Sequence, residues 1–116
     1  MTPASAVRAL SALAQPARLD AFRGLVQAGE AGVPAGELAA ALGLSPPALS
    51  FHLRALSAAG LVRSRQEGRF VFYSAQYAAM DQLLGFLTEN CCQGAECAPA
   101  RRVRCDAPPA RRRARS

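Results

Sequence analysis

The sequence predicts a mainly α-helical domain that carries one β-hairpin. Apolar residues recur at helical spacing in five segments between residues 5 and 90. Between the fourth and fifth segments, two short runs rich in branched and aromatic residues flank a glycine, which is the pattern of a hairpin. The order of a helix, a tight turn, a second helix and a hairpin predicts a winged helix-turn-helix.

The first two predicted helices are short. Residues 5–13 form the first, and its apolar positions are Val7, Leu10 and Leu13. Pro16 suits the first turn of the second helix, which ends near Gly29. One face of this second helix carries the apolar residues Leu19, Phe22, Leu25 and Val26. A turn through Gly32 and Pro34 follows.

The third and fourth helices are separated by the three-residue turn 43–45. Residues 35–42 form the alanine-rich third helix, and Gly43 stops it. Ser45 caps the fourth helix, with Pro46 at its first position, and Gly60 closes it. The inner face of the fourth helix carries Leu49, Leu53 and Leu56. A turn of this length suits two helices that cross steeply.

The predicted hairpin is followed by the fifth helix. Its strands are residues 61–65 and 69–74, joined by a turn at 66–68. The fifth helix spans residues 77–90 and is strongly amphipathic. Its apolar stripe is Met80, Leu84, Leu87 and then Cys91.

A chain of 116 residues is expected to form one domain. We assign residues 1–97 to this domain and interpret residues 98–116, which are rich in Arg, Pro and Ala without periodicity, as a mostly disordered tail. A domain this short buries a modest fraction of its surface, so a homodimer that hides further apolar area fits the composition.

The net charge of +6 is unevenly placed. Residues 101–116 hold seven arginines and one acid, whereas residues 1–100 hold seven arginines and seven acids. The tail could add salt-dependent attraction to phosphates or could simply solubilise the end of the chain. Because the charges of residues 1–100 balance, an argument for nucleic-acid binding by this part of the chain must rest on local groups of residues and not on net charge.

The sequence carries no signal for secretion or membrane insertion. The N-terminus lacks a basic segment followed by an apolar run, and no stretch reaches the roughly 18 apolar residues that a membrane span needs. We therefore expect a cytoplasmic protein with no membrane partner. Thiols stay reduced in that compartment, which favours ligand thiols over structural disulfides.

Three of the four cysteines lie within seven residues: Cys91, Cys92 and Cys97. Soft thiolates select soft or borderline metals and metalloids over calcium and magnesium. Zinc usually takes four ligands, whereas a trivalent metalloid such as arsenite or antimonite is satisfied by three sulfurs. The count therefore favours a three-thiolate ion, unless Cys105 or an outside ligand supplies a fourth. The adjacent pair could instead be apolar filler at a helix end or a redox pair.

The outward face of the fourth helix carries candidate DNA contacts. If this helix enters a major groove, its N-terminal and outward residues should touch the duplex. With Leu49 inward, a rotation of about 100° per residue places Phe51 and Arg54 roughly opposite the core. Arg54 can reach phosphates or base edges, and Phe51 could touch a thymine methyl. The candidates on this helix are Ser45, Pro47, Ser50, Phe51, His52 and Arg54.

The hairpin adds Arg65 and Arg69 to these candidates. Taken singly, such arginines would be an ordinary solvated surface. Within the order helix, turn, helix and hairpin, we interpret them as DNA contacts. His52 falls nearer the core flank and is equally well explained as a structural histidine or as a phosphate contact.

Three stretches of the chain carry a resemblance to a known family. Residues 13–19 (LAQPARL), 49–56 (LSFHLRAL) and 59–62 (AGLV), with Tyr73 in the hairpin, are similar to the ArsR/SmtB family of metal-responsive repressors. The resemblance covers roughly residues 5–97. It implies a homodimeric winged helix whose first and fifth helices build the dimer interface. It also implies that the inducer-free dimer binds a two-fold operator and that an inducer releases it.

The inducer site varies within that family. Its best-known arsenic sensors carry Cys-Val-Cys at the start of the recognition helix, but here the first cysteine is Cys91. Its zinc sensors use Asp and His pairs on the fifth helix, but here the only histidine is His52. The chain instead resembles a subgroup of arsenic repressors with a Cys-Cys pair and a third cysteine after the fifth helix. Cys91, Cys92 and Cys97 match that pattern, and Cys105 is not part of it.

The resemblance thus predicts a repressor of an arsenic-resistance operon, with double-stranded operator DNA as partner and no permanent cofactor. As(III), and by the same chemistry Sb(III) or a trivalent methylarsenical, would bind the three thiolates and reshape the end of the fifth helix. The recognition helices would then lose their half-site spacing of ~34–36 Å.

Three alternatives remain. The same fold could carry a thiol redox switch, or a constitutive nucleic-acid-binding protein could use the Arg-rich tail. An enzyme is disfavoured because cysteines after a helix C-terminus lack the field that stabilises a thiolate.

Overall fold

The computed structural model describes residues 1–90. The predicted tail at 98–116, and the end of the predicted domain beyond residue 90, lie outside the described residues. The helices are α1 Pro3–Leu13, α2 Pro16–Ala28, α3 Ala35–Leu42, α4 Pro46–Ala58 and α5 Tyr77–Leu87, and the strands are β1 Val33–Pro34, β2 Val62–Glu67 and β3 Phe70–Ala75. The predicted mainly helical winged helix-turn-helix is confirmed.

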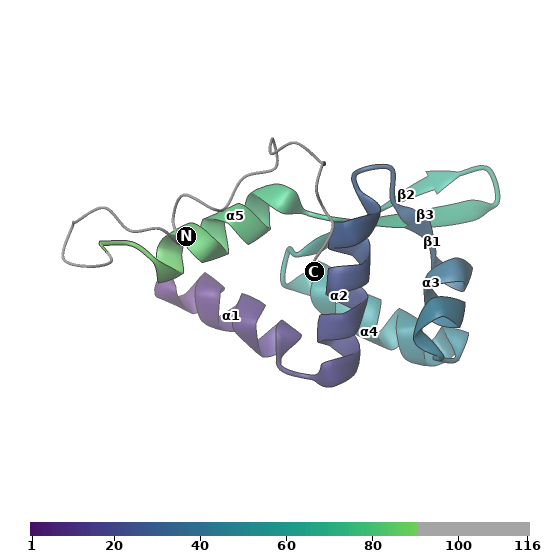
Figure 1. Cartoon of the computed structure of the whole chain (residues 1–116), viewed down its shortest axis with the longest axis horizontal. Coiled ribbons are helices and arrows are strands. Elements are labelled where there is room, and N and C mark those ends of the chain that lie inside the picture. Colours follow the sequence, from purple (N-terminus) through teal and green to yellow (C-terminus); the bar gives the residue numbers. More distant parts are fainter. Residues whose placement is uncertain (91–116) are drawn as a thin grey trace, which may run out of the picture.

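The elements are arranged along the long direction of the molecule (Figure 1). Helices α1 and α5 lie against each other at one end, and the three-stranded sheet and α3 lie at the other. Between them, α2 contacts α1, α3, α4 and β3. The second helix is therefore the scaffold on which the other elements pack.

Local sequence sets the helix ends. Thr2 and Ser5 form a reciprocal capping box in which each side-chain oxygen accepts from the other residue's backbone N–H, at 3.1 and 3.0 Å. This cap starts α1 at Pro3, two residues before the predicted start. Gly43 takes the left-handed conformation, with φ of 70°, and ends α3 at the predicted residue.

The sheet is antiparallel with the strand order β1-β3-β2. Glu67 pairs with Phe70, which leaves Gly68 and Arg69 as a two-residue loop. The predicted turn at 66–68 therefore lies one residue too early. Gly68 has φ of 62°, and glycine at the first loop position is typical of a type II′ hairpin turn.

The short strand β1 was not predicted. Val33 pairs with Tyr73 and Pro34 with Phe72, where a simple turn was expected. Gly32, just before this strand, has φ of 85°, and a Cβ there would lie 2.8 Å from the Tyr73 carbonyl oxygen. Only glycine fits this close approach without a backbone shift.

The core is built from leucines of several elements. Leu25, Leu49, Leu53, Leu56 and Leu61 are the largest fully buried side chains. The predicted inner face of α4 is thereby confirmed, and it fixes the rotation of that helix about its own axis.

The core face of α1 differs from the predicted apolar stripe. Its buried residues are Ala6, Ala9 and Ala12, whereas Val7 is 60% exposed and Leu10 is 42% exposed. The small alanine side chains allow close packing against α2, and the larger residues point away. Leu19 of the predicted α2 face is likewise exposed.

Helix α5 is shorter than predicted. It ends at Leu87, and residues 88–90 form a turn in which Asn90 has φ of 57°. The Leu84 carbonyl accepts from both the backbone N–H and the hydroxyl of Thr88, at 3.1 and 2.9 Å, so Thr88 closes the end of the helix. Leu83 is the buried residue of the helix, and Leu87 of the predicted stripe is 55% exposed. Cys91 lies outside the described residues.

Candidate nucleic-acid interface

A fixed turn presents α4 at the surface. The Leu44 N–H donates to the Ala39 carbonyl at 3.0 Å, just after Gly43 has turned the chain. The Ser45 hydroxyl then accepts from the Ala48 N–H at 3.3 Å and caps α4. Its hydroxyl hydrogen remains able to donate. Turn and core together hold α4 in one orientation.

The outward face of α4 carries the predicted residues. Pro47, Ser50 and Arg54 are exposed, and the Phe51 ring is 57% exposed. This exposed aromatic ring leaves apolar surface area in contact with water. A partner that covered the ring would gain the free energy of burying that area. Placement on one accessible face agrees with the helical-wheel prediction, and contact with DNA stays a prediction for each of them.

Arg18 joins the start of α2 to α4. Its Nε donates to His52 Nδ1 at 3.3 Å, and its guanidinium carbon lies 5.6 Å from the centre of the Phe51 ring. The Phe51 and His52 rings meet edge to face with their centres 5.6 Å apart. His52 is half-buried and has this partner, so it is held in place structurally.

Arg18 is not among the residues predicted from the sequence. It lies 34 residues before His52, and no local periodicity links the two positions. The available signal was its place in the LAQPARL stretch, directly before the second helix's apolar face.

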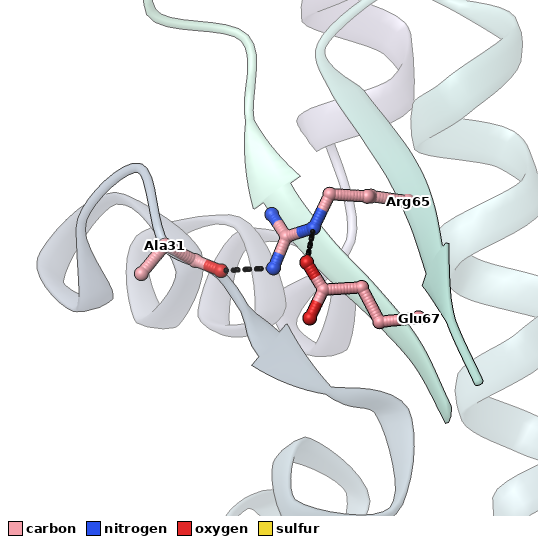
Figure 2. A network of polar contacts seen from close by, with 3 residues as sticks. All are labelled: Ala31, Arg65 and Glu67. Atoms are coloured by element: carbon pink, nitrogen blue, oxygen red, sulfur yellow. Dashed lines mark hydrogen bonds and ion pairs between the residues drawn. The ribbon is translucent and has the colours of Figure 1, made fainter. Parts of the chain in front are cut away.

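Arg65 is engaged within the protein (Figure 2). Its Nε forms an ion pair with Glu67 Oε2 at 2.6 Å, and its Nη2 donates to the Ala31 carbonyl at 3.1 Å. Its guanidinium carbon also lies 5.0 Å from the centre of the Phe72 ring. The bond to Ala31 ties the hairpin to the turn before β1, and the contacts with Glu67 and Phe72 lie within the hairpin. The DNA contact predicted for Arg65 would have to compete with them.

Arg69 occupies the second position of the hairpin loop and is exposed. Arg63 on β2 is exposed as well. Neither forms an ion pair with another described residue. The hairpin therefore presents two exposed guanidinium groups without an ion-pair partner among the described residues, in addition to the engaged Arg65.

The predicted metal ligands Cys91, Cys92 and Cys97 lie outside the described residues. Among residues 1–90, no group of three His, Cys, Asp or Glu side chains is placed to hold a metal ion. The same part of the chain contains no helix long and apolar enough to cross a membrane.

Comparison with known proteins supports the assignment of the fold. A helix-turn-helix domain family model matches residues 13–65. The nodulation protein NolR of Rhizobium meliloti is 40% identical over 80 residues, covering 69% of this chain and 63% of NolR. The aligned region is thus less than two thirds of that relative's length.

An ArsR-like transcriptional regulator from Rhodococcus sp. RHA1 is 32% identical, with a TM-score of 0.65, over 72% of this chain and 76% of that one. The chain belongs to the ArsR family of transcriptional regulators. This family consists of DNA-binding regulators and not of enzymes.

Two further solved structures are similar. A possible transcriptional regulator for arsenical resistance is 35% identical, with a TM-score of 0.60, over 67% of this chain and 78% of that one. A homodimeric winged helix-turn-helix DNA-binding domain from Mycobacterium bovis, a possible ArsR-family regulator, is 26% identical. Its TM-score is 0.60, over 82% of this chain and 88% of that one.

Proposed function

We propose that this ArsR-family protein is a homodimeric repressor that reads a two-fold operator through α4. The observation that carries the proposal is the outward face of α4, where Ser50, Phe51 and Arg54 are exposed. The hairpin adds the exposed Arg63 and Arg69. Hydroxyl, aromatic and guanidinium groups are suited to phosphates, thymine methyls and base edges. In a helix-turn-helix dimer, the second helix of the motif enters the major groove.

The dimer interface is proposed on α1 and α5. These helices lie against each other and leave Val7, Leu10 and Leu87 exposed on them. Met80 and Leu84 of α5 are half-buried. Three large apolar side chains open to water at one end of a small domain favour burial against a second copy. The homodimer formed by the similar M. bovis domain supports this assignment.

The inducer is proposed to be As(III), held by Cys91, Cys92 and Cys97 as three thiolates. Sb(III) and trivalent methylarsenicals share the chemistry that this donor set would recognise. The similarity to a possible regulator of arsenical resistance supports the proposal, as does the soft, closely spaced donor set. The genes under control would then be those of an arsenic-resistance operon.

Release requires the captured ion to favour one dimer geometry over another. The described residues end at Asn90, three residues after α5, and this end of α5 lies beside the start of α1 (Figure 1). Closing a three-sulfur site there would strain the proposed dimer interface and change the spacing of the two α4 helices. A hundredfold loss of operator affinity needs about 2.7 kcal/mol of coupling between the two sites.

Titration of arsenite into the reduced protein bound to a labelled operator tests this function. The operator is a duplex selected by the protein from a random library. We expect arsenite to release the operator from the unmodified protein. The arsenite concentration for half-release should be higher by about tenfold or more in Cys91→Ser, Cys92→Ser and Cys97→Ser. The matched control is Cys105→Ser, which should leave that concentration unchanged.

Two results would contradict the arsenic proposal. The first is release of the operator from all four variants at the same arsenite concentration. The second is release by peroxide alone with no response to arsenite, which would identify the thiol redox switch instead.

A further inference from the structure

A hollow of about 180 Å³ lies between α4 and the hairpin. Four of its lining residues share one face of α4 at positions i, i+3, i+4 and i+7, and the other two lie directly opposite each other on β2 and β3. The lining residues are Ser50, Leu53, Arg54, Ser57, Ser64 and Tyr73. Helix and hairpin therefore build one site that neither forms alone.

The chemistry of the lining points to an oxyanion. Three serine hydroxyls, a phenol and a guanidinium surround a single apolar side chain, that of Leu53. Arginine can only donate hydrogen bonds, and each hydroxyl can donate one. None of the described residues that line the hollow is acidic. A ligand that offers several acceptor oxygens and negative charge satisfies this set best.

These donors are available. Within the described chain, none of the five polar side chains of the hollow has a hydrogen-bond or ion-pair partner. By contrast, Arg65, which follows Ser64 on β2 and faces the other side of the hairpin, donates to Glu67 and to the Ala31 carbonyl. The volume is about six times the roughly 30 Å³ share of one water in the liquid. It is therefore large enough for a phosphate group.

We propose that this hollow seats a phosphate oxyanion, and that in the DNA complex the occupant is one backbone phosphate bordering the groove that α4 enters. This step rests on the proposed DNA-binding function. Ser50 and Arg54 belong both to the exposed face of α4 and to the hollow, so the hollow opens at the edge of the DNA-reading surface. Backbone phosphates line both edges of a groove, and contacts to them fix the register of the protein.

The proposal makes Ser57, Ser64 and Tyr73 phosphate contacts, although none of them was predicted from the sequence to contact DNA. It also assigns Arg54 to the DNA backbone instead of a base edge. Loss of a phosphate contact weakens binding to all sequences alike, whereas loss of a base contact relaxes specificity at one position. Arg54→Ala should therefore weaken selected and unrelated duplexes by the same factor and should reduce the salt slope by about 1.

The test combines protein variants with neutralised phosphates. Each phosphate of a selected operator is replaced in turn by an uncharged methylphosphonate, and affinities are measured for the unmodified protein and for a Ser64→Ala/Tyr73→Phe variant. We expect one phosphate per half-site whose neutralisation weakens the unmodified protein about tenfold but the variant less than about twofold. Gln27→Ala, at an exposed position of α2 outside both the hollow and the proposed dimer helices, is the polar control, and thermal unfolding confirms that each variant is folded.

The outcomes separate this proposal from the proposed function. If each neutralised phosphate lowers the operator affinity of the variant as much as that of the unmodified protein, the proposed phosphate site is wrong, while operator binding stands. If the protein selects no duplex, operator binding fails. In that case titration with inorganic phosphate decides the oxyanion seat. Saturable NMR shifts of the Ser64 and Tyr73 amides, lost in the variant, would support it, and their absence would overturn it.

Discussion

Gly32 shows how one residue controls the approach of two segments. Its φ of 85° and the 2.8 Å that would separate an added Cβ from the Tyr73 carbonyl oxygen leave no room for a side chain. We expect Gly32→Ala to lower the free energy of unfolding by about 1–3 kcal/mol, measured by urea denaturation. The matched control is Gly36→Ala in α3, where nothing lies within 4 Å and the alanine should be neutral or slightly stabilising. Equal effects of the two substitutions would contradict the steric argument.

The residues of the candidate site were predictable to different degrees. The exposure of Phe51 and Arg54 follows from helix geometry once Leu49 is known to face the core, so the sequence was sufficient. The contact of Arg18 with His52 and the hollow around Ser64 and Tyr73 depend on how separate elements pack. No sequence period encodes such packing, and both features needed the structure.

At the scale of elements, Arg65 holds the hairpin to the turn before β1. The ion pair with Glu67 is exposed and is worth at most about 1 kcal/mol, so its main effect is local. We expect Arg65→Gln to accelerate amide hydrogen exchange in the turn before β1 and in the hairpin, with little change in global stability. Arg63→Gln on the same strand is the control and should leave exchange unchanged. Equal protection in both variants would show that the contacts to Ala31 and Phe72 do not hold the hairpin.

The elements also show where sequence patterns succeed and fail. Helix α3 ends as predicted because Gly43 supplies a left-handed residue that stops it. Strand β1 was missed because two residues carry no periodicity and its partner lies about forty positions away on β3. The face of α1 was misassigned because alanine scores weakly as apolar, although Ala6 and Ala9 fit where a larger residue would not.

For the whole molecule, the exposed apolar residues of α1 and α5 bear on assembly. We expect a Val7→Asp/Leu10→Asp variant to sediment as a monomer at concentrations where the unmodified protein is a dimer, because two carboxylates would be buried without partners. The control is Phe70→Asp, at a position that is 63% exposed on the hairpin, away from α1 and α5. A dimer that survives in the first variant and is lost in the second would place the interface on the hairpin.

The contact from Arg18 to His52 fixes the tautomer of the imidazole. A guanidinium N–H can only donate, so Nδ1 must offer its lone pair and the ring hydrogen must sit on Nε2. The nitrogen that His52 keeps for another partner, Nε2, is therefore a donor. It can pair with N7 of guanine or adenine, with guanine O6, with thymine O4 or with a phosphate oxygen, and it gains nothing from the amino groups of adenine or cytosine. A long-range tether from α2 thus sets the hydrogen-bonding polarity of one position on the recognition helix.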